Sequence, residues 1–83
     1  MIKKTVMVVS VDKRRSQAPT AQKILTGYGC IIKTRLGIHD GVLDKCSDHG
    51  LLILELVGSE KEKKKLGQEL KSLPGVTVKT VNI

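Results

Sequence analysis

The sequence of 83 residues predicts an α+β fold whose elements follow one another in the order βαββαβ. Three observations support this prediction. Four short runs are rich in β-branched or alternating apolar residues, two stretches have apolar residues at helical spacing, and capping residues, glycines and prolines separate these segments. Two successive units of this kind make a ferredoxin-like domain, and the length suits a single domain over residues 1–83.

The first half of the chain is predicted to form a strand, a helix and a second strand. Residues 5–11 are mostly β-branched, which favours a strand. Ser16 is a candidate N-cap, and Pro19 would then fall in the first turn of the helix, where its missing N–H is tolerated. The helix has one apolar stripe, made of Ala21, Ile24, Leu25 and Tyr28. Residues 30–38 alternate as in a half-buried strand, and Cys30 is expected to be a small core residue.

The second half of the chain repeats this order. Residues 51–57 are apolar on both faces apart from Glu55, which is typical of a central strand. Ser59 and Glu62 have the spacing of a capping box, so a second helix is predicted to begin there. Its buried stripe would be Leu66, Leu70 and Leu73, and Leu73-Pro74-Gly75 would end it. Residues 76–81 form the last strand, with Val76 and Val78 on one face.

Right-handed crossovers place both helices on one face of a four-stranded antiparallel sheet in the spatial order 4-1-3-2. The first and third strands are the most apolar, as central strands should be, while the second and fourth carry charges that protect edges: Lys33, Arg35 and Lys79. The other face of the sheet is expected to carry an apolar patch of Met7, Val9, Val11, Ile31, Leu51, Ile53 and Val57. Such a patch indicates an interface, so we expect a homo-oligomer, a dimer or tetramer, with Glu55 near Lys33 or Arg35.

The composition limits the classes of function. Fifteen Lys and Arg against eight Asp and Glu give a net charge of +7, which favours acidic partners such as nucleic acid, phosphate groups or an anionic protein. A solvated basic surface is the alternative, because glutamates are interspersed in the lysine-rich run 61–71. One aromatic residue is too few for a base-stacking platform. The two cysteines and the absence of a recognisable signal peptide predict a cytoplasmic protein with reduced thiols, and no apolar run is long enough to span a bilayer.

Motifs for catalysis or for reading DNA are not evident. No Ser-His-Asp or Cys-His arrangement has a supporting context, and no glycine-rich phosphate loop occurs, so we expect neither an enzyme nor a cofactor. The apolar stripes commit both helices to the sheet, which leaves no direct DNA-reading element.

The predicted order of elements and the ending "LPGVTVKTV" resemble an ACT-type regulatory domain. More specifically, "ILTGYGCIIKTRLGIHD" and "GLLILELVGSEKEKKKLGQELKSLPGVTVKTV" resemble the stand-alone ACT-like family of iron-only hydrogenase system regulators, over nearly the whole chain. The resemblance implies a regulatory protein with a ligand or partner site at a subunit interface.

ACT domains often bind small effectors, commonly amino acids, beside the loop that follows the first strand. In this chain the corresponding residues are Asp12, Arg14, Arg15 and Ser16. N–H groups at the start of a helix and two nearby guanidinium groups suit a carboxylate or a phosphate. The alternative is that Asp12 and Ser16 cap the turn and the arginines are solvated. This loop also lacks the early glycine of many amino-acid-binding ACT domains, which argues against that ligand class.

Between the second and third strands lies a second candidate site, a loop of ligand-like residues. His39, Cys46 and His49 are candidate ligands for a borderline-soft metal such as zinc or nickel. The alternative is an ordinary polar connection, with Asp40-Gly41 and His49-Gly50 as turns. Nickel-responsive regulators also carry an ACT-like domain, but their ligand Cys directly precedes the third strand, where this chain has Gly50, so those ligands do not carry over.

The sequence therefore predicts a small, non-catalytic regulatory or ligand-sensing protein of the ACT-like type that acts as a homo-oligomer, and the resemblance implies that it regulates an iron-only hydrogenase system. It would bind a small-molecule effector or a protein partner. The alternative is a metal-sensing or nucleic-acid-associated module of a transcriptional regulator.

Overall fold

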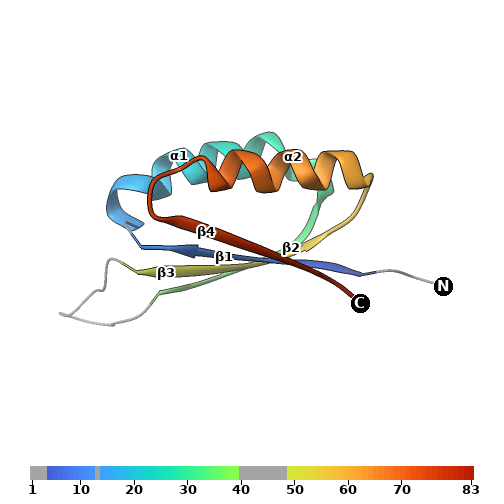
Figure 1. Cartoon of the computed structure of the whole chain (residues 1–83), viewed down its shortest axis with the longest axis horizontal. Coiled ribbons are helices and arrows are strands. Elements are labelled where there is room, and N and C mark those ends of the chain that lie inside the picture. Colours follow the sequence, from blue (N-terminus) through green and yellow to red (C-terminus); the bar gives the residue numbers. More distant parts are fainter. Residues whose placement is uncertain (1–3, 13, 40–48) are drawn as a thin grey trace.

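The computed structural model describes residues 4–12, 14–39 and 49–83, and of residues 14, 15, 38 and 39 only the backbone. Over these residues the chain forms β1 (Thr5–Val11), α1 (Arg14–Gly27), a short 3-10 turn (Gly29–Ile31), β2 (Ile32–His39), β3 (Gly50–Leu56), α2 (Glu60–Lys71) and β4 (Val76–Asn82). The strands form one antiparallel sheet in the order β2-β3-β1-β4, and both helices cover the same face of it (Figure 1). This arrangement confirms the predicted ferredoxin-like fold and its strand order.

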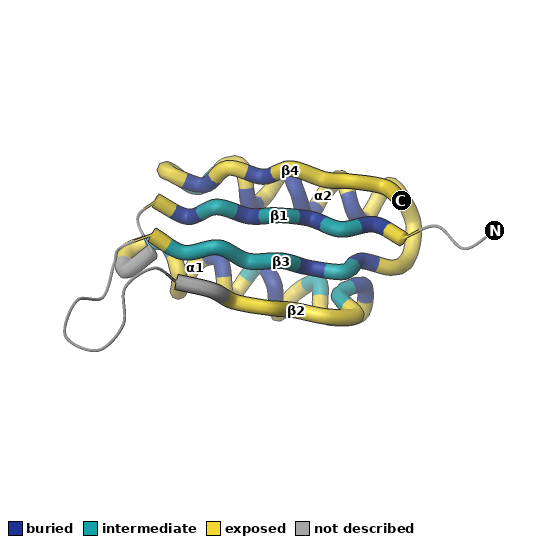
Figure 2. The backbone as a smooth tube through the Cα atoms, turned by 90° about the horizontal axis from the view of Figure 1, so that it is seen from below, coloured by how far each residue is buried: buried dark blue, intermediate teal, exposed yellow. Residues whose placement is uncertain are grey.

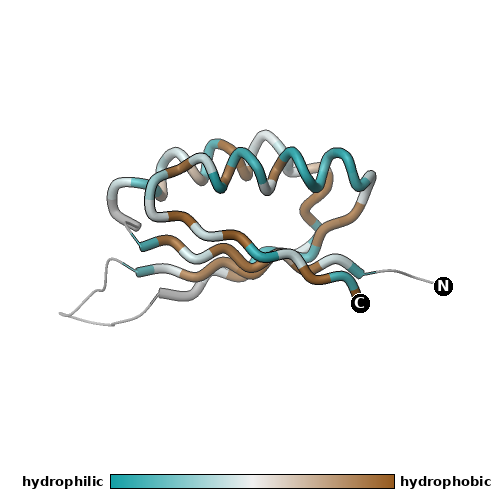
Figure 3. The backbone as a smooth tube through the Cα atoms, viewed as in Figure 1, coloured by the Kyte–Doolittle hydropathy of each residue, from teal (hydrophilic) through white to brown (hydrophobic). Residues whose placement is uncertain are grey.

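The core lies between the sheet and the two helices. The residues of β1 alternate in burial, and Thr5, Met7, Val9 and Val11 are the buried ones. They meet Leu54 and Leu56 of β3, Val76 and Val78 of β4, and the helix residues Ala21, Leu25, Leu66 and Leu70. Hydrophobic residues therefore lie along the strands, while α2 is largely hydrophilic outside its buried stripe (Figure 3).

The expected assignment of β1 to the faces of the sheet was wrong. Met7, Val9 and Val11 face the helices, and Ile31 is buried as well, so none of the four lies in the patch where it was expected. Val6 and Val8 take their place, because neighbours in register share a face: Val8 lies opposite Ile53, and Val6 opposite Val81. β1 has apolar residues at both its odd-numbered and its even-numbered positions, so packing rather than the sequence pattern determines which side of the strand is buried.

The face of the sheet without helices, called the open face below, still carries an apolar patch. Its members are Val6, Val8, Leu36, Leu51, Ile53 and Val81, which the strand register places on this side (Figure 2). Leu36 and Val81 are about half exposed, at 52% and 51%. At its edge Glu55 lies 4.0 Å from Lys33 Nζ, and Thr34 Oγ1 donates to Glu55 at 3.4 Å. The expected proximity of Glu55 and Lys33 is therefore confirmed.

Helix α1 begins three residues earlier than predicted, because an N-cap at Ser16 would have made Gln17 its first residue. Its first residue is Arg14, so Ser16 lies inside the helix and does not serve as its N-cap, and Pro19 stands in the second turn. The predicted apolar stripe is confirmed, with Ala21 and Leu25 buried and Ile24 and Tyr28 packed partly against the core. Cys30 is exposed, because a 3-10 turn precedes β2 and directs Ile31 into the core in its place.

Helix α2 begins as predicted, but it ends at Lys71, so Leu73 lies just beyond it. Ser59 has extended backbone angles and accepts a hydrogen bond from the Glu62 N–H at 3.2 Å, which is the expected cap. Leu66 and Leu70 are buried and Leu73 packs partly against the core. Gly67 lets the helix approach the sheet closely, since a Cβ there would lie 3.3 Å from Met7 Cε.

Tyr28, which directly follows α1, interacts with Glu69 of α2. A side-chain hydrogen bond with Glu69 raises the pKa of Tyr28 above its ordinary value of 10.0, and partial burial and the Glu69 charge act in the same direction. Because the pKa of Tyr28 is higher in the folded protein than in the unfolded chain, its interaction with Glu69 stabilises the fold below pH 10.0. This stabilisation is lost as the pH rises through the pKa of Tyr28 in the folded protein.

Titration of the single tyrosine, followed by its ultraviolet absorbance, is expected to give a midpoint above 10.0 in the native protein. Glu69→Gln should lower this midpoint toward the ordinary value, because it replaces the carboxylate of the hydrogen bond by a neutral amide and also removes the Glu69 charge. Glu60→Gln, which changes the net charge equally on the same helix, is the control. Equal midpoints in the Glu69→Gln variant and the parent protein would contradict the assignment.

Candidate functional site

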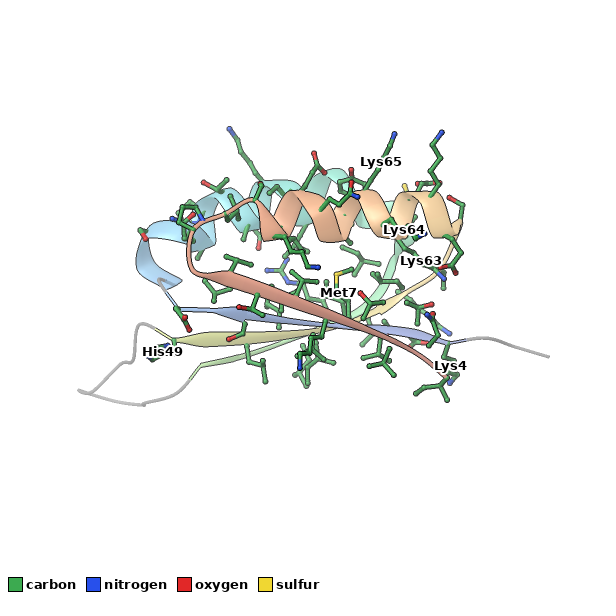
Figure 4. The ribbon with its side chains drawn as sticks, viewed as in Figure 1. Lys4, Met7, His49, Lys63, Lys64 and Lys65 are labelled. Carbon is green, nitrogen blue, oxygen red and sulfur yellow. The ribbon has the colours of Figure 1, made fainter. Side chains whose placement is uncertain are left out.

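One described residue from each of the two candidate loops lies at the same end of the sheet, namely Asp12 and His49. Asp12 directly follows β1, and His49 directly precedes β3. Val11 and Gly50 are paired in the antiparallel ladder, so their chain neighbours Asp12 and His49 are brought together. His49 Nδ1 lies 3.3 Å from Asp12 Oδ1, and each side chain is 62% exposed. Figure 4 shows His49 at this end of the sheet, opposite the end that carries Lys4.

The main chain of Asp12, the residue that directly follows β1, is held by a hydrogen bond. The Asp12 N–H donates to the Gly75 carbonyl at 2.8 Å, which joins this turn to the start of β4. The backbone of Asp12 is therefore fixed by Gly75, and its carboxylate is directed to His49. Arg14, Arg15 and Ser16 are the first three residues of α1. The side chains of both arginines lie outside the described part of the structure, so their role as ligand-binding groups stays a prediction.

Next to this end of the sheet lies a groove between α1 and the strands β2 and β3, with a volume of about 270 Å³. Its walls are mostly apolar and come from Val11, Ala18, Ala21, Leu25 and Leu52. We call it the effector groove. Gly37 leaves room on the β2 side, since a Cβ there would meet only Leu52 Cδ2, at the ordinary contact distance of 3.5 Å.

Two polar side chains line the effector groove. Arg35 extends from β2 and donates a hydrogen bond from Nη2 to Gln22 Oε1 of α1, which joins the strand to the helix across the groove. A guanidinium group has five N–H donors in one plane, so a ligand carboxylate or phosphate can bind to the remaining ones. An apolar cavity with a few convergent polar groups is the usual form of a small-molecule site.

Sequence reasoning did not identify Gln22, Arg35 or Gly37 as site residues. Arg35 was interpreted as a charge that protects an edge, although its alternation with Thr34 and Leu36 already placed it on one side of the strand. Gln22 stands one residue after Ala21 of the apolar stripe, at the position of α1 that borders β2. A polar residue beside such a stripe, and an Arg on the strand that follows it, were the available signals.

The metal prediction remains untested. Of its three residues, Cys46 and the side chain of His39 lie outside the described residues, and only His49 is placed. Within residues 4–12, 14–39 and 49–83, no three His, Cys, Asp or Glu side chains gather as a metal ion would require. Among the described residues, Asp12 and His49 thus bring only two donor side chains together, fewer than the three that a metal ion would require.

No helix in the described portion of the chain has both the length and the apolar character needed to cross a membrane.

The sequence matches no protein-family model and no curated protein. Solved structures do resemble it. An uncharacterized protein from Thermotoga maritima superposes with a TM-score of 0.82 at 22% identity, over 99% of both chains. The apo form of CPII from Thiomonas intermedia K12, a nitrogen regulatory PII-like protein, has a TM-score of 0.65 at 12% identity, over 99% of this chain and 90% of that one.

A second CPII structure, bound to ADP, AMP and acetate, has a TM-score of 0.60 at 12% identity, over 98% of this chain and 86% of that one. A formyltetrahydrofolate deformylase from Pseudomonas putida KT2440 has a TM-score of 0.60 at 8% identity, over 94% of this chain and 28% of the enzyme. What these proteins share with this chain is the ferredoxin-like fold, which occurs both in a stand-alone regulator and as part of an enzyme.

Proposed function

We propose that this protein is a non-catalytic regulator that binds a small anionic effector in the effector groove. The observation that carries the proposal is the placement of Arg35 and Gln22, from facing elements, in a groove whose walls are otherwise mostly apolar. Such a groove suits a ligand with an apolar body and one carboxylate or phosphate group. The PII-like CPII, which shares the fold, has been solved with ADP, AMP and acetate, and this supports the same class of ligand.

The Asp12–His49 pair would report the bound state to the rest of the protein. Both residues adjoin residues that line the groove, Val11 and Gly50, so a ligand there can alter the pair. The predicted ligand residues Arg14, Arg15 and Ser16 begin the helix that forms one wall. We place the regulated process, on the sequence resemblance alone, in an iron-only hydrogenase system, with the protein acting in the cytoplasm as a homo-oligomer.

Isothermal titration calorimetry with AMP, ADP, acetate and branched-chain amino acids tests this proposal. Gly37→Val is expected to weaken binding by about tenfold or more, because its side chain occupies the groove while its Cβ is accommodated. Arg35→Gln should weaken anionic ligands most. Gly29→Val is the matched control, since a Cβ at Gly29 meets nothing within 4 Å and this glycine does not line the groove.

Two results would contradict the proposal. One is an absence of heat with every anion in the panel. The other is binding that Gly37→Val and Gly29→Val weaken equally, which would place the ligand elsewhere. Circular dichroism of both variants should match that of the parent protein, so that a loss of binding is not a loss of fold.

A further inference from the structure

β4 is an edge strand, and this edge is distinct from the effector groove at the opposite side of the sheet. It pairs with β1 on one side, and among the described residues it is the last strand in the sheet order. The ladder between β1 and β4 extends beyond the strands, with Ile83 and Lys4 exchanging both hydrogen bonds at 2.8 and 3.1 Å. The outer N–H and C=O groups of such an edge can accept an added strand.

A groove of about 390 Å³ runs along this edge between β4 and α2. One wall is formed by a ridge of α2 residues spaced three or four apart, namely Glu60, Lys64, Gln68 and Lys71. The other wall is formed by Val78, Thr80 and Asn82, alternate residues of β4 that share the helix-facing side. The groove therefore follows the free edge of the strand over most of its length.

The groove is positively charged. Lys63 at its inner side is nine-tenths buried, and its Nζ contacts Glu60 Oε1 at 3.3 Å and Thr5 Oγ1 at 2.8 Å, so the acidic residue of the ridge already has a cationic partner. Lys64 and Lys71 are exposed. Figure 4 shows Lys63 directed from α2 toward the sheet, while Lys65 extends away from it. The groove thus presents two lysines to whatever lies beside β4.

From these observations we infer that the β4 edge binds an extended acidic segment of a partner protein, which adds to the sheet as a fifth strand. Backbone hydrogen bonds to β4 would hold the segment, and its helix-facing side chains would lie beneath the ridge. Lys64 and Lys71 are seven residues apart, or about 10 Å along the helix. Alternate residues of a strand are about 7 Å apart, so acidic residues at two or three alternate positions span the two lysines. The residues between them would lie beside Val81 on the open face and are expected to be apolar.

A second copy of this chain is a poorer occupant. Its β4 would bring Lys79 and another lysine-rich α2 to an edge that is already basic, in a chain of net charge +7. A nucleic acid would satisfy the lysines, but its backbone has no N–H and C=O pattern to pair with a strand edge. An acidic extended peptide matches both features at once.

The test uses the full chain and a labelled heptapeptide of alternating Glu and Val, with anisotropy to measure binding and amide hydrogen exchange to locate it. Lys64→Glu/Lys71→Glu is expected to weaken binding by at least about tenfold. Lys61→Glu/Lys65→Glu is the matched control, because it makes the same charge change on the same helix at positions that do not line the groove. The peptide should also slow exchange of β4 amides and leave β2 amides unchanged.

A peptide with N-methylated backbone amides should fail to bind, since it retains the charge but cannot donate to the edge. Four results would each overturn the inference: no binding of the heptapeptide, equal loss in the two double variants, binding without protection of β4, and binding of polyphosphate but not peptide. Slower exchange of the β4 amides when the chain alone is concentrated would show copies joined through β4 and would overturn it as well.

Discussion

Replacing Lys63 by glutamate is expected to lower the free energy of unfolding by about 3–5 kcal/mol. The Lys63 side chain is 10% exposed, and its Nζ donates to Thr5 Oγ1 at 2.8 Å and to Glu60 Oε1 at 3.3 Å. Thr5 Oγ1 in turn donates to Asn82 Oδ1 at 2.8 Å. A carboxylate at position 63 would face Glu60 at the i,i+3 spacing and leave Thr5 Oγ1 without its donor, in a region largely removed from water.

Chemical denaturation followed by circular dichroism measures this effect. Lys64→Glu is the control, because it makes the same charge change one residue along at an exposed position, and it should stay within about 0.5 kcal/mol of the parent protein. Lys63→Met, which keeps the length of the side chain, should cost about 1–2 kcal/mol, because only the hydrogen bond to Thr5 and the pairing with Glu60 are lost. Equal denaturation midpoints for Lys63→Glu and Lys64→Glu would show that the buried network does not stabilise the fold.

Lys63 also shows where a pattern failed to reveal a buried polar group. The stripe of α2 was predicted from leucines, and Lys63 stands three residues before Leu66, at a position of the same stripe. In a run of lysines it was interpreted as part of a solvated face. Its burial depends on Thr5 and Asn82, which are distant in sequence and come together only through the pairing of β1 with β4. The spacing was visible in the sequence, but the partners required the fold.

The order of the strands was predictable because it depends on features that are strong in this sequence. The capping box at Ser59 and the apolar run before it define β3 and α2, and the handedness of the crossovers then leaves one arrangement. The faces of β1 were not predictable in the same way. Its apolar residues occupy both odd-numbered and even-numbered positions. A shift of the strand register by one residue would therefore bury Val8 in place of Met7, and the hydrophobic pattern would fit equally well.

The candidate site was likewise predictable in part. The residues at each loop could be identified as polar and ligand-like, but they were assigned to two separate sites. The approach of Asp12 to His49 follows from the pairing of Val11 with Gly50, which places the end of β1 beside the start of β3. The effector groove itself depends on how α1 lies across β2, and this needs the packing of Ala21 and Leu25 against the core.

The open face bears on the proposed homo-oligomer. Val8 lies at its centre, opposite Ile53 on β3 and Lys79 on β4, and Leu36 lies opposite Ile53 from the other side. Contiguous apolar surface of this kind is costly to leave in water and is removed when two copies join. In a twofold assembly this same patch of each copy would face the other copy. The basic α2 helices lie on the far side of the sheet, so their charges stay apart in such an assembly.

Val8→Glu is therefore expected to raise the dissociation constant of the assembly by about 1000-fold, since each subunit loses about 2 kcal/mol and the twofold symmetry counts the change twice. Glutamate lowers the net charge of this basic chain, so dissociation could not be attributed to a larger overall charge on each copy. Thr20→Glu places the same charge on the exposed side of α1 and should leave assembly unchanged. Sedimentation velocity over a micromolar concentration series measures both variants. A parent protein that stays monomeric throughout the series, or a Val8→Glu variant that assembles like Thr20→Glu, would show that the open face does not join copies of this chain.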